Sequence, residues 1–273
     1  MLAKALLAAL TLPWASPSSD GKGQDWVVAY TAKQLQCARF LETGLSTIQT
    51  ETLRRVRHQT SERRGVWQFR AVPSAKAIAL EGWLDSLTVS RKSAETTISP
   101  DTDGLLGGRY RGTLSPTGAY DSSVRPFIPD EVAEVAGMAT ALDDFFPPLP
   151  HMQLEVGKAW SDSRGLTIRR LPDSSLSGLP LFRFQLERRD DTRTAPRRGD
   201  TLAVALRQVS EEHGVFVWHP LLGLVRRERN IVVETAVPTS RTVRQPVRSK
   251  VEQRIVVARD LTGDPTVCRP SAS

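Results

Sequence analysis

Near its C-terminus the chain alternates between apolar and charged residues in steps of two. One set of positions between 243 and 259 is mostly apolar: Val243, Val247, Val251, Ile255 and Val257. The intervening set is mostly charged: Arg244, Arg248, Lys250, Glu252 and Arg254. Successive side chains of a β-strand point to opposite faces, so this pattern predicts a strand with one apolar and one charged face. Such one-sided strands are typical of antiparallel sheets, and Pro246 marks an edge or a bulge.

Several further segments have the composition of strands. They are residues 65–72, 181–188, 201–209, 214–218 and 224–234. The turn-like stretch 219–223 separates the last two segments, which are therefore predicted to pair as a β-hairpin. Residues 101–108, rich in Asp and Gly, predict another turn.

One helix is predicted near the middle of the chain. Pro129, Asp130 and Glu131 suit its first turn, where the helix dipole favours acidic side chains. Apolar residues then recur at helical spacing: Val132, Val135, Met138, Ala139 and Leu142. The helix has to end before Pro147. The apolar segment 145–150 that follows is expected to cross the sheet as an extended strap.

These elements predict a mainly β protein with an antiparallel sheet and one central helix. We divide the chain into a signal peptide and flexible lead (1–23), an N-terminal β half (24–128), the helix and strap (129–150) and a C-terminal β half (151–273). Residues 105–107 and 221–223 share the sequence Leu-Leu-Gly, which suggests two similar halves, although three residues recur easily by chance. The sequence leaves open whether the halves form one domain or two.

The N-terminus favours export. Lys4 precedes the apolar run 5–12, which fits a secretory signal peptide and is far shorter than the roughly 20 residues of a membrane-spanning helix. The alternative is a buried N-terminal helix, which Pro13 and the Ser/Gly-rich stretch up to residue 23 disfavour. We therefore expect an exported protein, either periplasmic or extracellular.

The chain has two cysteines, Cys37 and Cys268. In an oxidising compartment an even number favours pairing, so we expect a disulfide that ties the start of the mature chain to its tail. Two free thiols are the alternative. Zinc is not expected, because two distant cysteines lack the paired spacing of a structural site.

The chain is basic, with a net charge of +7, and from residue 224 onward ten Lys and Arg face five Asp and Glu. The charged face of the C-terminal strand, with Arg244, Arg248, Lys250 and Arg254, is therefore a candidate surface for an anionic envelope component. Plain solubility explains the charge equally well. Nucleic acid is not expected as a partner, because aromatic residues make up only 6% of the chain and do not interleave with the basic run.

No catalytic site is recognisable, and neither a cofactor nor a metal is expected. His213 and His219 would lie on one face of one strand but roughly 20 Å apart, too far to share a metal ion. Glu131, Glu134 and Asp144 could supply a hydrolase with acid/base groups. A solvated face that complements the helix dipole is the simpler interpretation. The chain has neither a Gly-x-Ser-x-Gly elbow nor a phosphate-binding loop.

The strap and the residues after it carry a resemblance. The run Phe145-Phe146-Pro147-Pro148-Leu149-Pro150, followed by Val156-Gly157-Lys158-Ala159-Trp160, resembles a signature of uncharacterised exported bacterial proteins. In that group a Leu-Pro precedes a Val-Gly-x-x-Trp that enters a new strand. The resemblance implies the curved antiparallel half-barrel of LolA/LppX-type lipoprotein carriers, whose concave face holds acyl chains against helices. This chain lacks the lipidated cysteine of the lipoprotein members.

In a sheet curved in this way, large apolar side chains are candidates to line a concave ligand pocket. The candidates are Trp67, Trp83, Met138, Leu142, Phe145, Phe146, Trp160 and Trp218. Tryptophans are most often part of the core, and this alternative stays open.

The patterns together favour an exported, non-enzymatic envelope protein that binds a hydrophobic ligand or lipid. The alternative is a basic interaction or structural module that recognises an anionic partner. A hydrolase has the least support.

Overall fold

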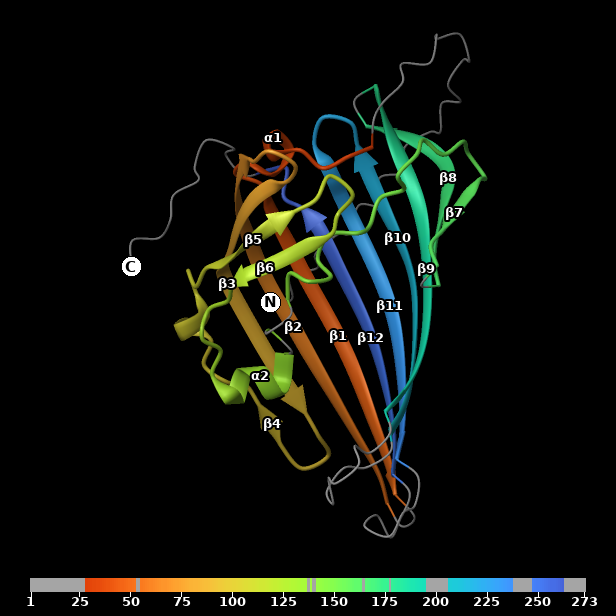
Figure 1. Cartoon of the computed structure of the whole chain (residues 1–273). Coiled ribbons are helices and arrows are strands. Elements are labelled where there is room, and N and C mark those ends of the chain that lie inside the picture. The colour runs from red at the N-terminus through yellow and green to blue at the C-terminus, as the bar shows by residue number, and fades with distance from the viewer. Residues whose placement is uncertain are drawn as a thin grey trace, which may run out of the picture.

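The protein forms one curved antiparallel sheet (Figure 1). The structure is a computed structural model that describes residues 28–52, 55–136, 138, 141–163, 165–176, 178–194, 206–237 and 247–262. In these residues twelve strands belong to a single sheet, accompanied by two short α-helices and one 3-10 helix. The prediction of a mainly β fold built on a curved antiparallel sheet is confirmed.

The strands of the first half are β1 (Arg39–Thr52), β2 (Arg55–Pro73), β3 (Ile78–Lys92), β4 (Thr97–Ile98), β5 (Tyr110–Leu114) and β6 (Tyr120–Val124). Those of the second half are β7 (Ala159–Ser161), β8 (Leu166–Leu176), β9 (Leu179–Thr194), β10 (Leu206–His219), β11 (Gly223–Val237) and β12 (Val247–Arg259). The helices are α1 (Ala32–Leu35), the 3-10 helix η1 (Asp103–Leu105) and α2 (Asp130–Ala136).

Two arms of the sheet extend outward from a seam between β1 and β12. The order is β6-β5-β3-β2-β1-β12-β11-β10-β9-β8-β7, with β4 paired to β3 off this path. Each arm is built largely from strands that are consecutive in sequence. The seam is the exception, because it joins the first and last described strands over an antiparallel register from Phe40↔Arg259 to Glu51↔Arg248.

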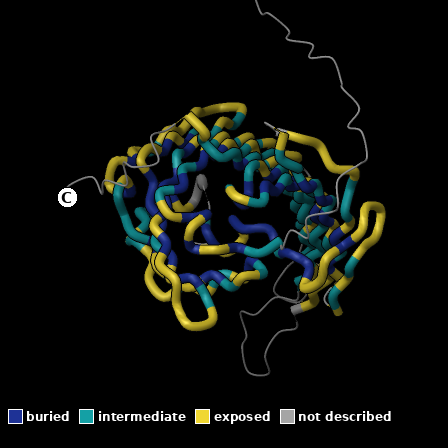
Figure 2. Tube along the Cα trace, turned by 90° about the horizontal axis from the view of Figure 1, so that it is seen from above, coloured by how far each residue is buried: buried dark blue, intermediate teal, exposed yellow. Residues whose placement is uncertain are grey.

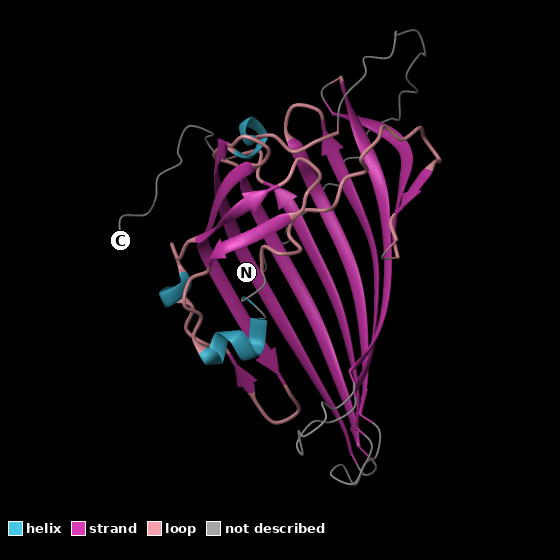
Figure 3. Ribbon diagram, viewed as in Figure 1, coloured by secondary structure: helices cyan, strands magenta, loops and turns pink. Residues whose placement is uncertain are grey.

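The long strands are splayed at one end of the molecule and converge at the other (Figure 1 and Figure 3). The hairpin of β5 and β6, helix α2 and the connection from β6 to β7 lie on the concave side of the sheet. Viewed from above, the strands surround an interior that other parts of the chain cross (Figure 2). The concave face is therefore covered at the end of the sheet where the strands are splayed, which we call the wide end.

The ladder registers assign the two faces of the sheet. Phe40 on β1 lies opposite both Trp67 and Arg259, and directly opposed residues of antiparallel strands share a face. From this row the odd positions of β2, β11 and β12 and the even positions of β1, β9 and β10 face the concave side. The charged even positions of β12, Arg248, Lys250, Glu252 and Arg254, consequently face the convex side, as the sequence pattern predicts.

Aromatic side chains fill the wide end of the concave face. Phe40, Trp67 and Phe69 from the sheet are buried against Phe145 and Phe146 from the strap. Ring centroids of Phe40 and Phe145 are 5.5 Å apart, and those of Phe69 and Phe146 are also 5.5 Å apart, in edge-on geometries that aromatic pairs prefer. The strap therefore packs across the sheet and forms part of its core.

The helix differs from its predicted length. The α-helical conformation ends at Ala136, whereas the apolar spacing continues to Leu142. Met138 and Leu142 are buried, but the backbone there makes short-range turns, with the Ala141 N–H donating to the Met138 carbonyl and the Phe145 N–H to the Leu142 carbonyl. Tight turns bring these side chains to the core although a regular helix does not continue that far.

His219 lies at the turn end of the hairpin of β10 and β11. The hairpin of β10 and β11 forms as predicted, with His219 opposite Gly223, but the register shifts between Val217 and Trp218. The extra residue, Val225, is on β11, and the register of β10 with β9 is unbroken. His219, at the end of β10, is 4% exposed and accepts hydrogen bonds from the turn, while His213 on the same strand is exposed. The predicted strand segments 201–205 and 243–246 lie outside the described residues.

Candidate functional site

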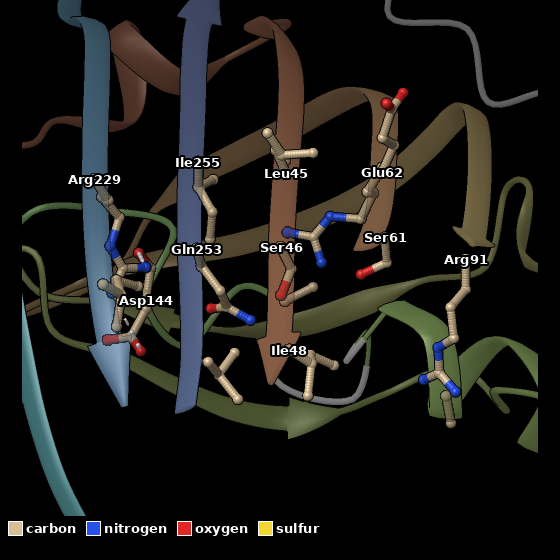
Figure 4. Close-up of a pocket in the computed structure, with 16 residues that line it drawn as sticks. Leu45, Ser46, Ile48, Ser61, Glu62, Arg91, Asp144, Arg229, Gln253 and Ile255 are labelled. Carbon is tan, nitrogen blue, oxygen red and sulfur yellow. Dashed lines mark hydrogen bonds and ion pairs between the residues drawn. The ribbon is translucent and has the colours of Figure 1, made fainter. Parts of the chain in front are cut away.

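A groove lies on the concave face, toward the narrow end from the aromatic core, between the sheet and the segment that contains α2 (Figure 4). We call it the concave groove. Its volume is about 470 Å³, within the range of roughly 300–1,000 Å³ that is typical of small-molecule sites. Strands β1, β2, β3, β11 and β12 contribute to its walls, and Ala133, Ala141 and Asp144 lie on the opposite side.

The floor of the groove is formed by four β-branched residues: Ile48, Ile231, Val251 and Ile255. They share a face because Ile48 lies opposite Val251, while Ile255 lies opposite Arg229, two positions from Ile231. Each of the four is only half-buried. The floor is thus an apolar strip that the protein's own side chains leave partly uncovered.

Two arginines and one glutamate form a buried ionic cluster at the β11 wall. Arg229 donates from Nε to Glu212 Oε1 at 2.7 Å and from Nη2 to Oε2 at 3.1 Å, a bidentate pair. Arg227 donates from Nη2 to the same Oε1 at 3.2 Å. The three residues are 4–8% exposed, so two buried positive charges share one carboxylate.

The same arginines hold the strap against the sheet. Arg227 donates to the backbone carbonyls of Asp144 and Phe145, and Arg229 donates to the Asp144 carbonyl at 3.1 Å. The carboxylate of Asp144 is 61% exposed and comes within 3.8 Å of Arg229 Nη2. Because these carbonyls lie outside regular secondary structure, the guanidinium groups satisfy backbone acceptors that the fold would otherwise bury unpaired.

Charge and burial shift the pKa values in this cluster. Burial, followed by the charge of Arg229, lowers the pKa of Arg227 to about 9. Burial acts to raise the pKa of Glu212, but the hydrogen bond and charge of Arg229 and the charge of Arg227 outweigh it and lower that pKa below its usual range. Glu212 is therefore ionised at neutral pH, and the cluster carries an excess of positive charge.

A second ionic group occupies the β1–β2 wall. Arg63 pairs with Glu42, whose other oxygen accepts a hydrogen bond of 2.6 Å from the indole N–H of Trp67. Arg63 also lies 3.7 Å from the sulfur of Met138 and lines the groove. Glu42 is 5% exposed, and its two partners account for its burial as a charged group.

Six of the eight candidate pocket residues belong to the packed core. They are Trp67, Met138, Leu142, Phe145, Phe146 and Trp218, each no more than 4% exposed. Trp160 is only partly buried, against the same core and His151. Trp83 is buried outside this cluster, beneath the guanidinium of Arg109 at 4.0 Å from its ring, and donates to Asp85. None of the eight lines the concave groove, and their role in ligand binding stays a prediction.

The candidate anionic-partner residues that the structure describes lie on the convex face. Arg254 pairs with Glu228 at 2.7 Å, and Lys250 pairs with Glu252 at 2.7 Å. Arg248 lies opposite Glu51 in the ladder, and Arg244 is outside the described residues. The neighbouring carboxylates reduce the local excess of positive charge that motivated this surface.

The carboxylates proposed for a hydrolase are not brought together by an observed contact. Glu131 is exposed on α2, and the side chain of Glu134 lies outside the described residues. Asp144 faces Arg229 instead of a second acid. Nowhere in the described part of the chain do three His, Cys, Asp or Glu side chains meet in a way that could hold a metal ion. Among the same residues, no helix is long and apolar enough to cross a membrane.

The signal peptide, residues 1–23, and Cys268 lie outside the described residues, so export and the Cys37–Cys268 disulfide stay predictions. Cys37, two residues before β1, has a φ of 56°, the one positive φ of a non-glycine residue in the described chain.

The fold and the groove define a class of protein: an open, curved antiparallel sheet with a partly uncovered apolar strip on its concave face. No protein-family model matches the chain, and neither does any curated protein. Among solved structures it is similar to lipovitellin, in a study described as showing lipid–protein interactions, with 10% identity and a TM-score of 0.40. The match covers 84% of this chain but 26% of the lipovitellin chain, so the present chain spans about a quarter of it.

Two further solved structures resemble the chain more weakly. A DUF1329 family protein from Desulfovibrio piger has 11% identity and a TM-score of 0.21, over 84% of this chain and 88% of that one. MucB in complex with MucA has 10% identity and a TM-score of 0.12, over 84% and 91%. These likenesses are distant and identify no site residue. They do not confirm the resemblance to LolA/LppX-type carriers.

Sequence patterns alone did not single out the groove residues. Ile231, Val251 and Ile255 belong to segments that the pattern predicts as strands, but Ile48 stands among polar neighbours and its pairing with Val251 is not local. The charged pairs Glu42–Arg63 and Glu212–Arg229 join residues 21 and 17 positions apart on neighbouring strands. The sequence signal for these pairs is a charged residue at a position that otherwise faces the core, because a buried charge needs a partner of opposite charge.

Proposed function

We propose that the protein binds a hydrophobic ligand or lipid in the concave groove. The observation that carries this proposal is the apolar floor of Ile48, Ile231, Val251 and Ile255, which is half-buried, faces Ala133, Ala141 and Asp144 and lies beside buried charged groups. A concave apolar surface with a few convergent polar groups is the usual composition of a small-molecule site. The aromatic core beside it is filled by the protein itself, so we place the ligand in the groove.

The role that we propose is that of a non-enzymatic envelope protein, exported to the periplasm or the extracellular space. The support for export is the signal-like composition of residues 1–23. The support for binding without catalysis is the ionic pairing of the buried acids Glu42 and Glu212, which engages both as structural partners of arginines.

A groove-filling variant tests the proposal. We expect the neutral dye N-phenyl-1-naphthylamine to bind the wild-type protein with an increase in fluorescence, and Val251→Trp to bind it at least about tenfold more weakly, because the indole occupies the floor. Val215→Trp is the matched control, since Val215 is 37% exposed on the convex face.

Circular dichroism of both variants establishes that the sheet is retained. Equal dye binding by Val251→Trp and the wild type would place the ligand elsewhere, and absence of dye binding by the wild type would remove the proposal. Native mass spectrometry of gently purified protein adds an independent reading through the mass of any co-purified lipid.

A further inference from the structure

The concave face carries its charge as arginine. The registers place nine arginines on this face, against the acids Glu42, Asp190 and Glu212; the arginines are Arg55, Arg57, Arg63, Arg91, Arg170, Arg188, Arg227, Arg229 and Arg259. No lysine occupies a concave position in the described strands, although lysines occur on their convex positions. Arginine offers five N–H donors in a planar fork that fits carboxylates and phosphates. The face is therefore suited to an anion as well as to an apolar chain.

Arg229 is the arginine that lies next to the apolar floor, where one ligand could place both an anionic group and an apolar chain. It lies directly opposite Ile255 and two positions from Ile231, so its guanidinium borders the apolar floor. Three of its N–H groups donate to Glu212 and to the Asp144 carbonyl. The Asp144 carboxylate, at 3.8 Å, is beyond hydrogen-bond distance. Among the described contacts this leaves Arg229 with N–H groups that a ligand can engage at the groove wall.

The buried cluster behind Arg229 is electrostatically incomplete. Arg227 and Arg229 share Glu212, and the strap offers them only neutral carbonyls and the exposed carboxylate of Asp144. Burial, and after it the charge of Arg229, lowers the pKa of Arg227. A negative group at the groove wall would neutralise the cluster in a region of low solvent access, where a charged hydrogen bond is strongest.

We infer that the groove selects a single-chain amphiphile with an anionic head group. The head group binds at Arg229, where it takes the place that the Asp144 carboxylate approaches, and the chain lies along Ile231, Ile255, Val251 and Ile48. The volume of about 470 Å³ suits one such ligand. This inference rests on the proposed function and adds to it the charge of the ligand and the residue that binds the charged head group.

Competition with N-phenyl-1-naphthylamine tests the inference on the full-length protein. Dodecanoate and 1-dodecanol have the same chain and differ in charge, and acetate supplies the head group without the chain. We expect dodecanoate to displace the dye at a concentration about tenfold lower than dodecanol does, since a charged hydrogen bond is worth about one order of magnitude or more in affinity. Acetate is expected to displace none.

Two variants locate the selectivity. Arg229→Gln is expected to reduce the dodecanoate/dodecanol preference to about unity. Because Arg229 also stabilises buried Glu212, the exposed Asp144 gives an independent variant: Asp144→Asn removes the competing carboxylate and is expected to raise the preference several-fold. Asp143→Asn is the matched control, because Asp143 pairs with Arg125 and does not line the groove, and its preference is expected to equal that of the wild type.

The outcomes separate this inference from the proposed function. Equal displacement by dodecanoate and dodecanol overturns the inference and leaves ligand binding intact. If neither Arg229→Gln nor Asp144→Asn changes the preference for dodecanoate over dodecanol, the inference is also overturned, since the anionic group then binds elsewhere. Failure of the dye and of both dodecyl compounds to bind overturns both.

Discussion

On the concave face, buried charged side chains stabilise the fold because each makes hydrogen bonds to several partners. Arg227 donates to the Glu212 carboxylate and to the backbone carbonyls of Asp144 and Phe145. Glu42 accepts from Arg63 and from the Trp67 indole N–H. Removing one partner of such a buried group costs more than the net value of the contact, because the remaining group stays desolvated. Substitutions in these clusters are therefore expected to affect stability as well as binding.

His219 provides a pH-dependent contribution to stability. Its Nδ1 accepts from the Leu221 and Leu222 N–H groups at 3.1 and 3.2 Å, an arrangement that requires the unprotonated nitrogen. Burial, and secondarily the charge of Arg259, lowers its pKa below the ordinary value. In the window between that lowered pKa and about 6.5 the unfolded state binds the proton and the folded state does not. The free energy of unfolding is therefore expected to fall as the pH drops below about 6.5.

Urea unfolding at pH 7.5, 6.5 and 5.5 measures this contribution. His219→Asn, whose side-chain oxygen can still accept from the turn, is expected to lose part of the dependence between pH 6.5 and 5.5. His213→Asn, an exposed position on the same strand, is expected to keep it. A wild-type slope that His219→Asn leaves unchanged would assign the effect to other groups.

At the scale of elements, the strap is the segment that contacts both arms of the sheet across the concave face. It brings Phe145 between Phe40, Trp67 and Phe69, with ring centroids 5.2–5.9 Å apart, so it contacts both sheet and core. Its backbone carbonyls at 144 and 145 are held by β11. One short segment thus connects β1 and β2 on one arm with β11 on the other.

Phe145→Ala is expected to lower the free energy of unfolding by about 3–5 kcal/mol, because it removes a buried ring and leaves a cavity. Equilibrium urea denaturation measures the change. Phe127→Ala tests an equally large ring in the same connection that is 84% exposed, and it is expected to change stability by less than about 0.5 kcal/mol. Similar losses for both variants would contradict the role assigned to the strap.

How far the sequence predicts this fold depends on how local each signal is. The alternation in β12 and the hairpin at His219–Gly223 are recovered because period and turn are set by neighbouring residues. The bulge at Trp218 and the early end of α2 are not recovered, since both depend on packing against the rest of the sheet. The groove requires strand order, which brings Ile48 beside Val251, about two hundred positions away in sequence.

For the whole molecule, the two arms form one continuous sheet joined at a single seam. The expected Cys37–Cys268 disulfide would close the chain near that seam, because Cys37 precedes β1 and Cys268 follows β12 in sequence. In the chain-entropy model so long a loop contributes about 4–5 kcal/mol. Reduction, or Cys37→Ser, is expected to lower the free energy of unfolding by up to that amount.

Thiol labelling of protein isolated from an oxidising compartment decides whether the bridge is present. Denatured, unreduced protein is expected to take up no alkylating reagent, and reduced protein two equivalents by mass. Labelling of both cysteines before reduction would show free thiols and would also weaken the expectation of export.

The seam between β1 and β12 affects how the molecule is made. While the ribosome is producing the middle of the chain, β1 has β2 as a neighbour but its other edge has no strand to bind, since β12 is synthesised more than two hundred residues after β1 begins. An unpaired edge of this length is a template for association with other chains. The sheet can therefore be completed only after the last strand has been synthesised. A holding chaperone that keeps the nascent chain unfolded until then would prevent association through this edge.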